Sequence, residues 1–354
     1  MSPPAPFVAC SNCFVDEGLR LDAEHLGEDD HSLCPRCAAS KGRKLTSHRL
    51  ATLAQGFFVW GSLRRFDYGS APRIQFNDRL KSDIELPGSL NADAAVFEDA
   101  LGIGFFPYEP RSWMFGEVEP LEALQCYESR SAVIARILRE YGSRTLTVQN
   151  KFYRIRKNPD EPSRVEQYDS PPAELSNGRL NTAQLPVLYA SPDLQTCLHE
   201  CRVTAEDDLF MATLRPARDL KLLDVAALLD EPRRVSEFES LDLAVNMLFL
   251  AGTHSYPIAR ELSHAAQSAG FDGIVYPSYF SMLRNGVKPF ETTYGMWHRR
   301  IPQYRKFEEA KVSANFAIFG RPIQEGLVDV CCINRVVLST VLYGVHFGPG
   351  AGYE

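Results

Sequence analysis

The sequence lacks the runs and motifs that mark several large classes of protein. No uninterrupted apolar stretch approaches the roughly 18 residues that cross a bilayer, and no secretory apolar segment is present. Neither G-x-G-x-x-G after a strand nor G-x-x-x-x-G-K-[ST] occurs, so hydride transfer by a classical dinucleotide-binding fold and P-loop hydrolysis lose support. Internal repeats and long low-complexity segments are also missing. We therefore expect a globular cytoplasmic protein with no membrane partner.

The composition is that of an ordinary folded chain with an acidic balance. The 354 residues are 45% hydrophobic and 23% charged, which allows two or three domains with a sizeable core. The net charge of -7 argues against broad electrostatic binding to nucleic acid. One basic run, residues 41–49, has the pattern of a solvated linker. The composition leaves the oligomeric state open.

Four of the nine cysteines form two CxxC pairs, and these are Cys10, Cys13, Cys34 and Cys37. Their separation falls near the window expected for a structural zinc site, in which four thiolates complete a tetrahedral shell with no open position. Disulfides are the alternative, but the five remaining cysteines and the missing secretory segment favour a reduced chain. His25 and His31 lie between the pairs and could replace a ligand. We predict a small zinc ribbon or knuckle over residues 1–44.

The second half of the chain contains four polar residues in a suggestive order. Arg179 follows an Asn-Gly turn, Tyr189 closes an apolar run, Glu200 lies on the next predicted helix, and Ser278 follows a late strand. Each has an ordinary structural reading, as a surface charge, a core aromatic, an exposed helical acid and a turn residue. The strand-to-helix context from Tyr189 to Glu200 favours a shared site.

Taken in this order, these residues resemble the RES domain, a family named for its Arg-Glu-Ser signature, over roughly residues 148 to 345. Two further residues extend the resemblance. Arg154 lies in a stretch similar to the family's opening strand, and Asn315 precedes alternating apolar residues as in its closing strand. RES domains are known as NAD-degrading toxins that resemble ADP-ribosyltransferases in fold. The resemblance therefore implies an α+β domain with a mixed sheet, NAD as substrate, and an antitoxin or regulatory protein as partner.

The resemblance also implies roles for these residues. A carboxylate at Glu200 would stabilise the positive charge that builds on the ribose as nicotinamide leaves. The ring of Tyr189 offers a stacking face for nicotinamide. Ser278 would bind the nicotinamide amide or a ribose hydroxyl, with Ser281 competing for that assignment.

The remaining candidates would bind other parts of NAD. Guanidinium groups match phosphate oxygens in a bidentate way, so Arg179 and Arg154 are candidates for the pyrophosphate. Arg154 also fits an ordinary edge strand, and Asn315 also fits a turn residue that opens a strand.

The chain divides into four segments by pattern. Residues 1–44 form the zinc module, residues 45–145 a mainly helical region, residues 146–345 the RES-like catalytic domain, and residues 346–354 a flexible tail. The second segment includes an amphipathic helix over 120–141, in the position of the helical, HEPN-related region of longer RES proteins. The R-x4-H pair Arg43 and His48 lies in the basic linker, which disfavours a ribonuclease. Two strands, 209–214 and 220–223, are expected to pair as a hairpin around Pro216.

The prediction is an enzyme that cleaves the nicotinamide-ribose bond of NAD, as a glycohydrolase or phosphorylase, and that acts as a toxin or defence effector. In terms of reaction class it is a hydrolase or a glycosyltransferase. One alternative is mono-ADP-ribosyl transfer to a macromolecule. The other is a non-catalytic module that binds a nucleotide or a protein partner, with the zinc module as the one place where nucleic acid could bind.

Overall fold

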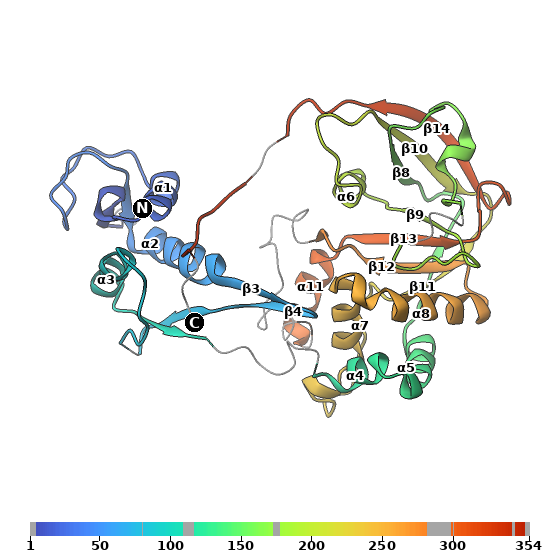
Figure 1. Cartoon of the computed structure of the whole chain (residues 1–354), viewed down its shortest axis with the longest axis horizontal. Helices are drawn as coiled ribbons and strands as arrows, with labels where there is room; N and C mark the ends of the chain where they lie inside the picture. Colours follow the sequence, from blue (N-terminus) through green and yellow to red (C-terminus); the bar gives the residue numbers. More distant parts are fainter. Residues whose placement is uncertain are drawn as a thin grey trace. The chain divides into compact units, whose positions relative to one another are not determined.

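The chain folds into two compact units in a computed structural model (Figure 1). The structure describes residues 5–79, 81–108, 117–172, 178–281, 299, 301–341 and 344–350. The first unit consists of residues 1–65, 70–111 and 342–354, and the second of residues 66–69 and 112–341. Within the part of the chain that the structure describes, no helix combines the length and apolar character needed to cross a membrane.

Among its described residues, the first unit combines three helices with short strands. Its elements are β1 (Phe7–Cys10), α1 (Glu17–Leu26), β2 (Lys44–Thr46), α2 (Ser47–Ala54), a π-helical turn (Gln55–Val59), β3 (Leu63–Phe66), β4 (Gly69–Pro72), β5 (Ile74–Asn77), α3 (Leu90–Leu101) and β6 (Gly104–Pro107), with 3-10 turns at Ser11–Cys13 and Trp60–Ser62. Antiparallel pairs form between β1 and β2 and between β5 and β6, and β3 pairs with β4. The segment 45–145 therefore contains two strand pairs besides its helices.

A phenylalanine cluster and one buried carboxylate hold the first unit together. Phe58 and Phe97 both pack against Phe105, with ring centroids 4.4 and 6.1 Å from it. Asp93 of α3 is fully buried, and its two oxygens accept hydrogen bonds from the backbone N–H groups of Val15 and Asp16 at 2.7 and 2.8 Å. These bonds fix the chain just before α1, which begins after Asp16. The carboxylate thus joins α3 to the start of α1.

The second unit contains eight strands and six helices among its described residues. The strands are β7 (Ser143–Leu146), β8 (Phe152–Lys157), β9 (Val187–Ala190), β10 (Leu209–Pro216), β11 (Leu220–Asp224), β12 (Gly273–Pro277), β13 (Ala314–Phe319) and β14 (Val328–Val336). The helices are α4 (Glu119–Gln125), α5 (Tyr127–Glu140), α6 (Leu194–Glu200), α7 (Leu241–Leu250), α8 (Tyr256–Ser268) and α11 (Arg305–Lys311), with 3-10 turns at Val165–Tyr168, Glu237–Glu239, Thr253–Ser255 and Pro302–Tyr304.

The strands of the second unit form two sheets around one core. A five-stranded sheet has the order β7-β11-β12-β13-β9, in which β11 and β12 run parallel and the other neighbours run antiparallel. A three-stranded antiparallel sheet has the order β14-β10-β8. Phe152 and Leu214 of the small sheet pack with Leu222 and Val275 of the large one, and α7 and α8 contact β12 of the large sheet (Figure 1). The mixed sheet confirms the α+β class.

Two local predictions are wrong. The strands β10 and β11 do not pair as a hairpin, because β10 has both edges occupied by β8 and β14 while β11 lies between β7 and β12. The helix over 120–141 is broken at Cys126, whose backbone is extended. Side chains of α5 satisfy the end of α4: Ser129 donates to the carbonyl of Ala123, and Arg130 donates to that of Leu124. Periodicity alone does not show such a break.

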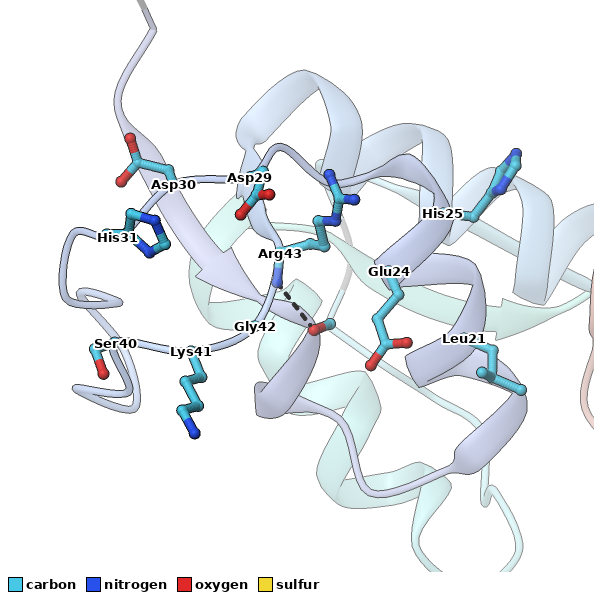
Figure 2. A pocket seen from close by; sticks show the side chains of 11 residues that line it. Leu21, Glu24, His25, Asp29, Asp30, His31, Ser40, Lys41, Gly42 and Arg43 are labelled. Atoms are coloured by element: carbon cyan, nitrogen blue, oxygen red, sulfur yellow. Dashed lines mark hydrogen bonds between the residues drawn. The ribbon is translucent and has the colours of Figure 1, made fainter.

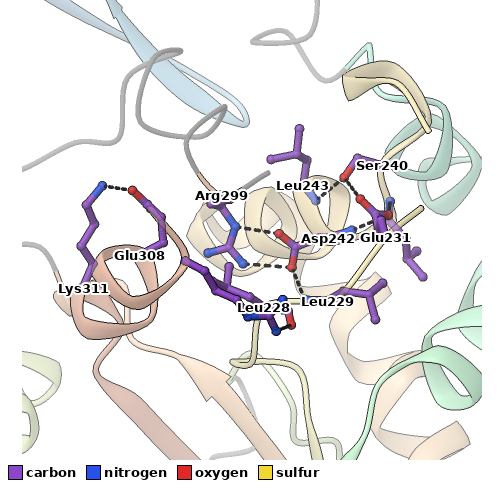
Figure 3. Close-up of polar contacts among 11 residues, drawn as sticks. Leu228, Leu229, Glu231, Ser240, Asp242, Leu243, Arg299, Glu308 and Lys311 are labelled. Carbon is purple, nitrogen blue, oxygen red and sulfur yellow. Dashed lines mark hydrogen bonds and ion pairs between the residues drawn. The ribbon is translucent and has the colours of Figure 1, made fainter. Parts of the chain in front are cut away.

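A buried ion pair lies at the start of α7 (Figure 3). Asp242 accepts two hydrogen bonds from the guanidinium of Arg299 at 2.8 and 3.0 Å, and the two side chains are only 4% and 6% exposed. Asp242 also accepts from the backbone N–H of Leu229. Burial, with the charge of Asp242 beside it, raises the pKa of Tyr141 well above its ordinary value. The pair joins α7 to chain segments distant in sequence.

We predict that Asp242→Asn lowers the free energy of unfolding by about 3 kcal/mol or more, because it removes the buried carboxylate charge that pairs with the buried guanidinium of Arg299. Chemical denaturation of the purified protein measures this change. The matched control is Asp329→Asn, which breaks the half-exposed pair with Arg215 and should cost under about 1 kcal/mol. Equal losses in the two variants would contradict the prediction.

Candidate functional site

The four predicted metal ligands converge in the first unit. Their sulfur atoms all lie within 4.8 Å of one another. The Sγ atom of Cys10 is 3.5 Å from that of Cys37 and 3.9 Å from that of Cys13, which is 3.7 Å from that of Cys34. A tetrahedral zinc with Zn–S bonds of about 2.3 Å places its sulfurs about 3.8 Å apart. The cluster therefore has the dimensions of a tetrathiolate metal site.

Local backbone structure brings these cysteines together. The strand β1 ends at Cys10, and the following 3-10 turn delivers Cys13. In the second pair, Ala38 adopts a left-handed conformation with φ of 56°, and its N–H donates to the carbonyl of Cys34 at 2.9 Å. Burial raises the pKa of Cys10 to about 11, so a cation is needed to keep its thiolate in neutral solution. The four residues fit a divalent metal.

The two histidines between the cysteine pairs are not in this cluster. His25 and His31 instead line an open groove of about 660 Å³ beside the loop that follows Cys37 (Figure 2). The groove also carries charges of both signs, from Asp29 and Asp30 on one side and Lys41 on the other. Four cysteine ligands complete a tetrahedral shell, and no histidine is needed to replace one.

Glu200, Ser278 and Asn315 meet in the second unit. Glu200 is the last residue of α6, and its Oε1 accepts hydrogen bonds from Ser278 Oγ at 2.5 Å and from Asn315 Nδ2 at 2.6 Å. Ser278 and Asn315 are buried, whereas Glu200 is exposed. One carboxylate oxygen is therefore held by two buried side chains, while the residue stays open to solvent.

The sheet and α6 set this geometry. Asn315 on β13 lies opposite Tyr276 on β12, and the N–H of Ser278 continues the pairing by donating to the carbonyl of Ser313. The helix α6 begins after Asp193, whose carboxylate accepts from the N–H of Thr196. The thiols of Cys197 and Cys201 then donate to carbonyls of β8. These contacts present the C-terminal end of α6 to the end of β12.

Ser281 has a different place from Ser278. Its hydroxyl donates to the carbonyl of Ser278 at 2.8 Å and accepts from the N–H of Ser313 at 2.9 Å. These bonds close the turn after β12. Ser278, by contrast, directs its own hydroxyl to Glu200.

Tyr189 is fixed through its hydroxyl. The hydroxyl accepts a hydrogen bond from the N–H of Leu180 at 2.8 Å and donates to Asn181 Oδ1 at 3.0 Å. A side chain at Gly178 would approach Asn181 Oδ1 to 2.2 Å, so this tight contact requires glycine. Burial raises the pKa of Tyr189 to about 12, which keeps the hydroxyl protonated at neutral pH. Its ring meets that of Tyr276 edge to face at 6.5 Å.

The two predicted phosphate-binding arginines donate to backbone carbonyls. Arg179 donates to the carbonyls of Leu248 and Ala251, at the C-terminal end of α7, and its guanidinium lies 4.8 Å from the ring centroid of Tyr256. Such a position suits a cation because helix C-termini carry partial negative charge.

Arg154 lies deeper in the same unit. Its guanidinium donates to the carbonyls of Tyr189 and Asp169 at 2.7 and 3.0 Å, and its Nε has no partner among the described residues. Burial lowers its pKa to about 9, but the two carbonyl acceptors favour the charged form, and we regard it as protonated at neutral pH. Arg154 therefore supports the strand end that carries Tyr189.

Sequence reasoning missed three contributors to this region. Tyr276 lies two residues before Ser278 on a strand, and the period-two pattern places both on one face. Burial, followed by the nearby Glu200 charge, raises its pKa well above the ordinary value. Asn181 binds Tyr189, as described above. Arg156 donates to the carbonyls of Gln167 and Asp169, and no pattern in the sequence distinguishes it from a surface arginine.

Comparison with known proteins supports the resemblance. Residues 151–311, a little under half of the chain, match the family model of the RES domain, which confirms the resemblance carried by Arg179, Glu200 and Ser278. Asn315 lies beyond the matched range. No curated protein matches the chain. Among solved structures, a chain from the M. tuberculosis MbcT-MbcA toxin-antitoxin complex is 14% identical with a TM-score of 0.33, over 58% of this chain and 91% of that one.

We predict that the purified protein contains about one zinc ion per chain, because four thiolates complete one tetrahedral shell. Metal analysis by mass spectrometry measures this ratio. Cys34→Ser should lose the metal, whereas Cys126→Ser, an exposed cysteine outside the cluster, should keep it. A metal-free protein with two disulfides at these four cysteines would refute the site.

Proposed function

We propose that the second unit cleaves the bond between nicotinamide and ribose in NAD. The observation that carries this proposal is the exposed carboxylate of Glu200, held at one oxygen by Ser278 and Asn315. The match to the RES domain supports NAD as the substrate, because the family is known for NAD degradation. The same match supports the wider role of a toxin or defence effector that an antitoxin or regulatory protein controls.

The carboxylate of Glu200 suits the charge that forms in this reaction. As the C–N bond breaks, its electron pair goes to the nicotinamide nitrogen and positive charge develops on the ribose. A preorganised negative group near that charge stabilises the transition state more than the ground state. Because Oε1 is fixed by two hydrogen bonds, the second oxygen of Glu200 is the atom that would face the ribose.

Ser278 and Asn315 act in this proposal as positioning residues. Each donates to the same oxygen of Glu200, and each is fixed by the pairing of β12 with β13. A carboxylate held by two buried donors loses little freedom when substrate binds.

The rings of Tyr189 and Tyr276 supply the aromatic surface beside this carboxylate. Burial and the nearby charge of Glu200 raise the pKa of Tyr276. The ring of Tyr189 packs edge to face against that of Tyr276. We assign the stacking of nicotinamide to Tyr189, a residue that is partly exposed. Arg154 holds the carbonyl of Tyr189 and Arg179 holds the end of α7, so we assign them a supporting role in place of direct phosphate contact.

The acceptor of ADP-ribose separates the two catalytic possibilities. In hydrolysis, a water oxygen bonds to the ribose carbon and a proton is released; in phosphorolysis, a phosphate oxygen takes the same place. Transfer to a macromolecule is the alternative. We favour water or phosphate, because the matched RES domain is known for NAD degradation.

We predict that Glu200→Gln lowers nicotinamide release from NAD by at least about 100-fold, because it removes the charge and keeps the side-chain volume. Chromatography of the released nicotinamide measures the rate, and mass spectrometry of the ribose product identifies the acceptor. The control is Glu206→Gln, another exposed glutamate near the end of α6, which should leave the rate unchanged.

The possible outcomes separate the hypotheses. Equal rates in wild type and Glu200→Gln would remove Glu200 from the mechanism. NAD binding without release, in wild type as well as in the variant, would favour the non-catalytic binding module. A mass increase on a protein or nucleic acid from a cell extract would favour ADP-ribosyl transfer.

We predict that Tyr189→Phe and Tyr189→Leu have different effects. The phenylalanine variant loses the hydrogen bonds to Leu180 and Asn181, so its free energy of unfolding should fall by about 1 kcal/mol while the stacking ring remains. The leucine variant also loses the ring, and its KM for NAD should rise by roughly tenfold or more, as stacking on aromatic side chains predicts. Steady-state kinetics and denaturation of both proteins test this. Equal KM values would show that the ring does not contact substrate.

A further inference from the structure

The first unit contains a fully buried lysine that no carboxylate neutralises. Lys44 opens β2 and has no exposed surface. Its Nζ donates to the carbonyls of Ser40 and Gly42 at 3.1 and 3.0 Å, and none of the ion pairs formed within the described residues includes it. Removing an ammonium group from water is unfavourable unless an anion compensates its charge. The position of Lys44 therefore calls for a nearby negative group.

One acidic side chain, Asp30, interacts electrostatically with Lys44, but it does not meet this need. The pKa of Asp30 is lowered mainly by its hydrogen bonds with Ser32, and Lys44 makes a smaller contribution. The carboxylate accepts from the N–H of Ser32 at 2.7 Å. Asp30 also lines the open groove in Figure 2, where water screens its charge.

Lys44 is joined to the segments that carry both cysteine pairs. Lys44 is the cross-strand partner of Cys10 in the β1–β2 pair, and partners in an antiparallel pair have side chains on one face of the sheet. The carbonyls that bind its Nζ belong to the loop that follows Cys37. That loop closes tightly, because Gly42 has a left-handed φ of 94°.

A zinc ion bound by four thiolates has a net charge of two negative units. We propose that Lys44 is the built-in counter-charge of the metal-loaded cysteine cluster and that it raises the affinity of these cysteines for zinc. The inference rests on the zinc site predicted above. Residues outside the ligand shell commonly change metal affinity by about 10- to 100-fold when they are substituted.

A different role is conceivable for the same contacts: Lys44 could hold the loop only by its hydrogen bonds to two carbonyls. The two roles differ in what they require of the side chain. Hydrogen bonding can be supplied by a neutral amide, whereas charge compensation cannot. They also differ in the metal-free protein, which lacks the negatively charged metal-thiolate group that the lysine would compensate.

Two variants of Lys44 separate these roles. Lys44→Met removes the charge and the hydrogen bonds, and Lys44→Gln removes the charge but keeps an N–H donor. Competition with a chelator of known affinity measures zinc binding, and cobalt absorption reports whether the site stays tetrahedral. We expect both variants to bind zinc about 10- to 100-fold more weakly. Lys41→Met, an exposed lysine in the same loop, should change the affinity less than about twofold.

Thermal unfolding of loaded and metal-stripped protein gives the second readout. If Lys44 compensates the metal site, its replacement lowers the Tm of the loaded protein and leaves that of the stripped protein equal or higher. Equal losses in the two forms, or wild-type affinity in Lys44→Gln, would overturn the counter-charge role. Should Lys44→Met not fold, Lys44→Gln alone decides the question.

The charge of the site itself offers an independent check. Cys37→His replaces a thiolate by a neutral ligand, which leaves one negative unit on the loaded site. In the Cys37→His protein, Lys44→Gln should weaken zinc binding by a smaller factor than it does in the wild type. The same fold-loss of affinity in both backgrounds would count against the proposal. A wild-type protein without metal would overturn the zinc site itself, whereas bound metal with no effect of Lys44 overturns only this inference.

Discussion

The pairing of β12 with β13 is the constraint on which the site of the second unit depends. Both strands are buried in the five-stranded sheet, and their antiparallel register places Tyr276 opposite Asn315. Ser278 follows at the end of the same ladder and is fixed by the backbone of Ser313. Because the sheet sets these positions, Ser278 and Asn315 can direct their donors at one oxygen of Glu200. A carboxylate on a seven-residue helix thus acquires a defined orientation from the sheet beneath it.

Around this centre, one buried and two half-buried arginines donate hydrogen bonds to backbone carbonyls. Arg154 and Arg156 both donate to the carbonyl of Asp169, and Arg154 also binds the carbonyl of Tyr189. Arg179 donates to the carbonyls of Leu248 and Ala251 at the end of α7. Arginine suits this task because its planar group offers five donors in fixed directions and remains charged. The two arginines predicted to bind phosphate, Arg154 and Arg179, thus also hold backbone carbonyls of this unit.

The first unit depends on a different kind of interaction. Its strands are short, and its phenylalanine cluster is joined to the start of α1 by the buried carboxylate of Asp93. The cysteine cluster lies against the same core, because Cys13 packs on it, and a metal ion there would join the end of β1 to the loop that carries Cys34 and Cys37. Lys44 is a buried residue of β2, and its side chain binds carbonyls of the loop that follows Cys37. Metal binding and local stability are therefore expected to be coupled in this unit.

The sequence by itself determined the features that rest on residue type and local spacing. The two CxxC pairs identified the four cysteines that cluster in the structure, the alternation of strands and helices indicated an α+β chain, and the order of Arg179, Tyr189, Glu200 and Ser278 pointed to the RES domain. Only the tertiary structure decided which side chains touch. Ser278 and Asn315 lie 78 and 115 residues from Glu200 in the chain, and no periodicity shows that they share one of its oxygens. The separate sheets of β10 and β11 have the same origin, because strands distant in sequence pair with their edges. The break at Cys126 is local, since Ser129 and Arg130 of the next helix bind the last carbonyls of α4. Local pattern fixes what a residue can do, and the packing of distant segments fixes what it does.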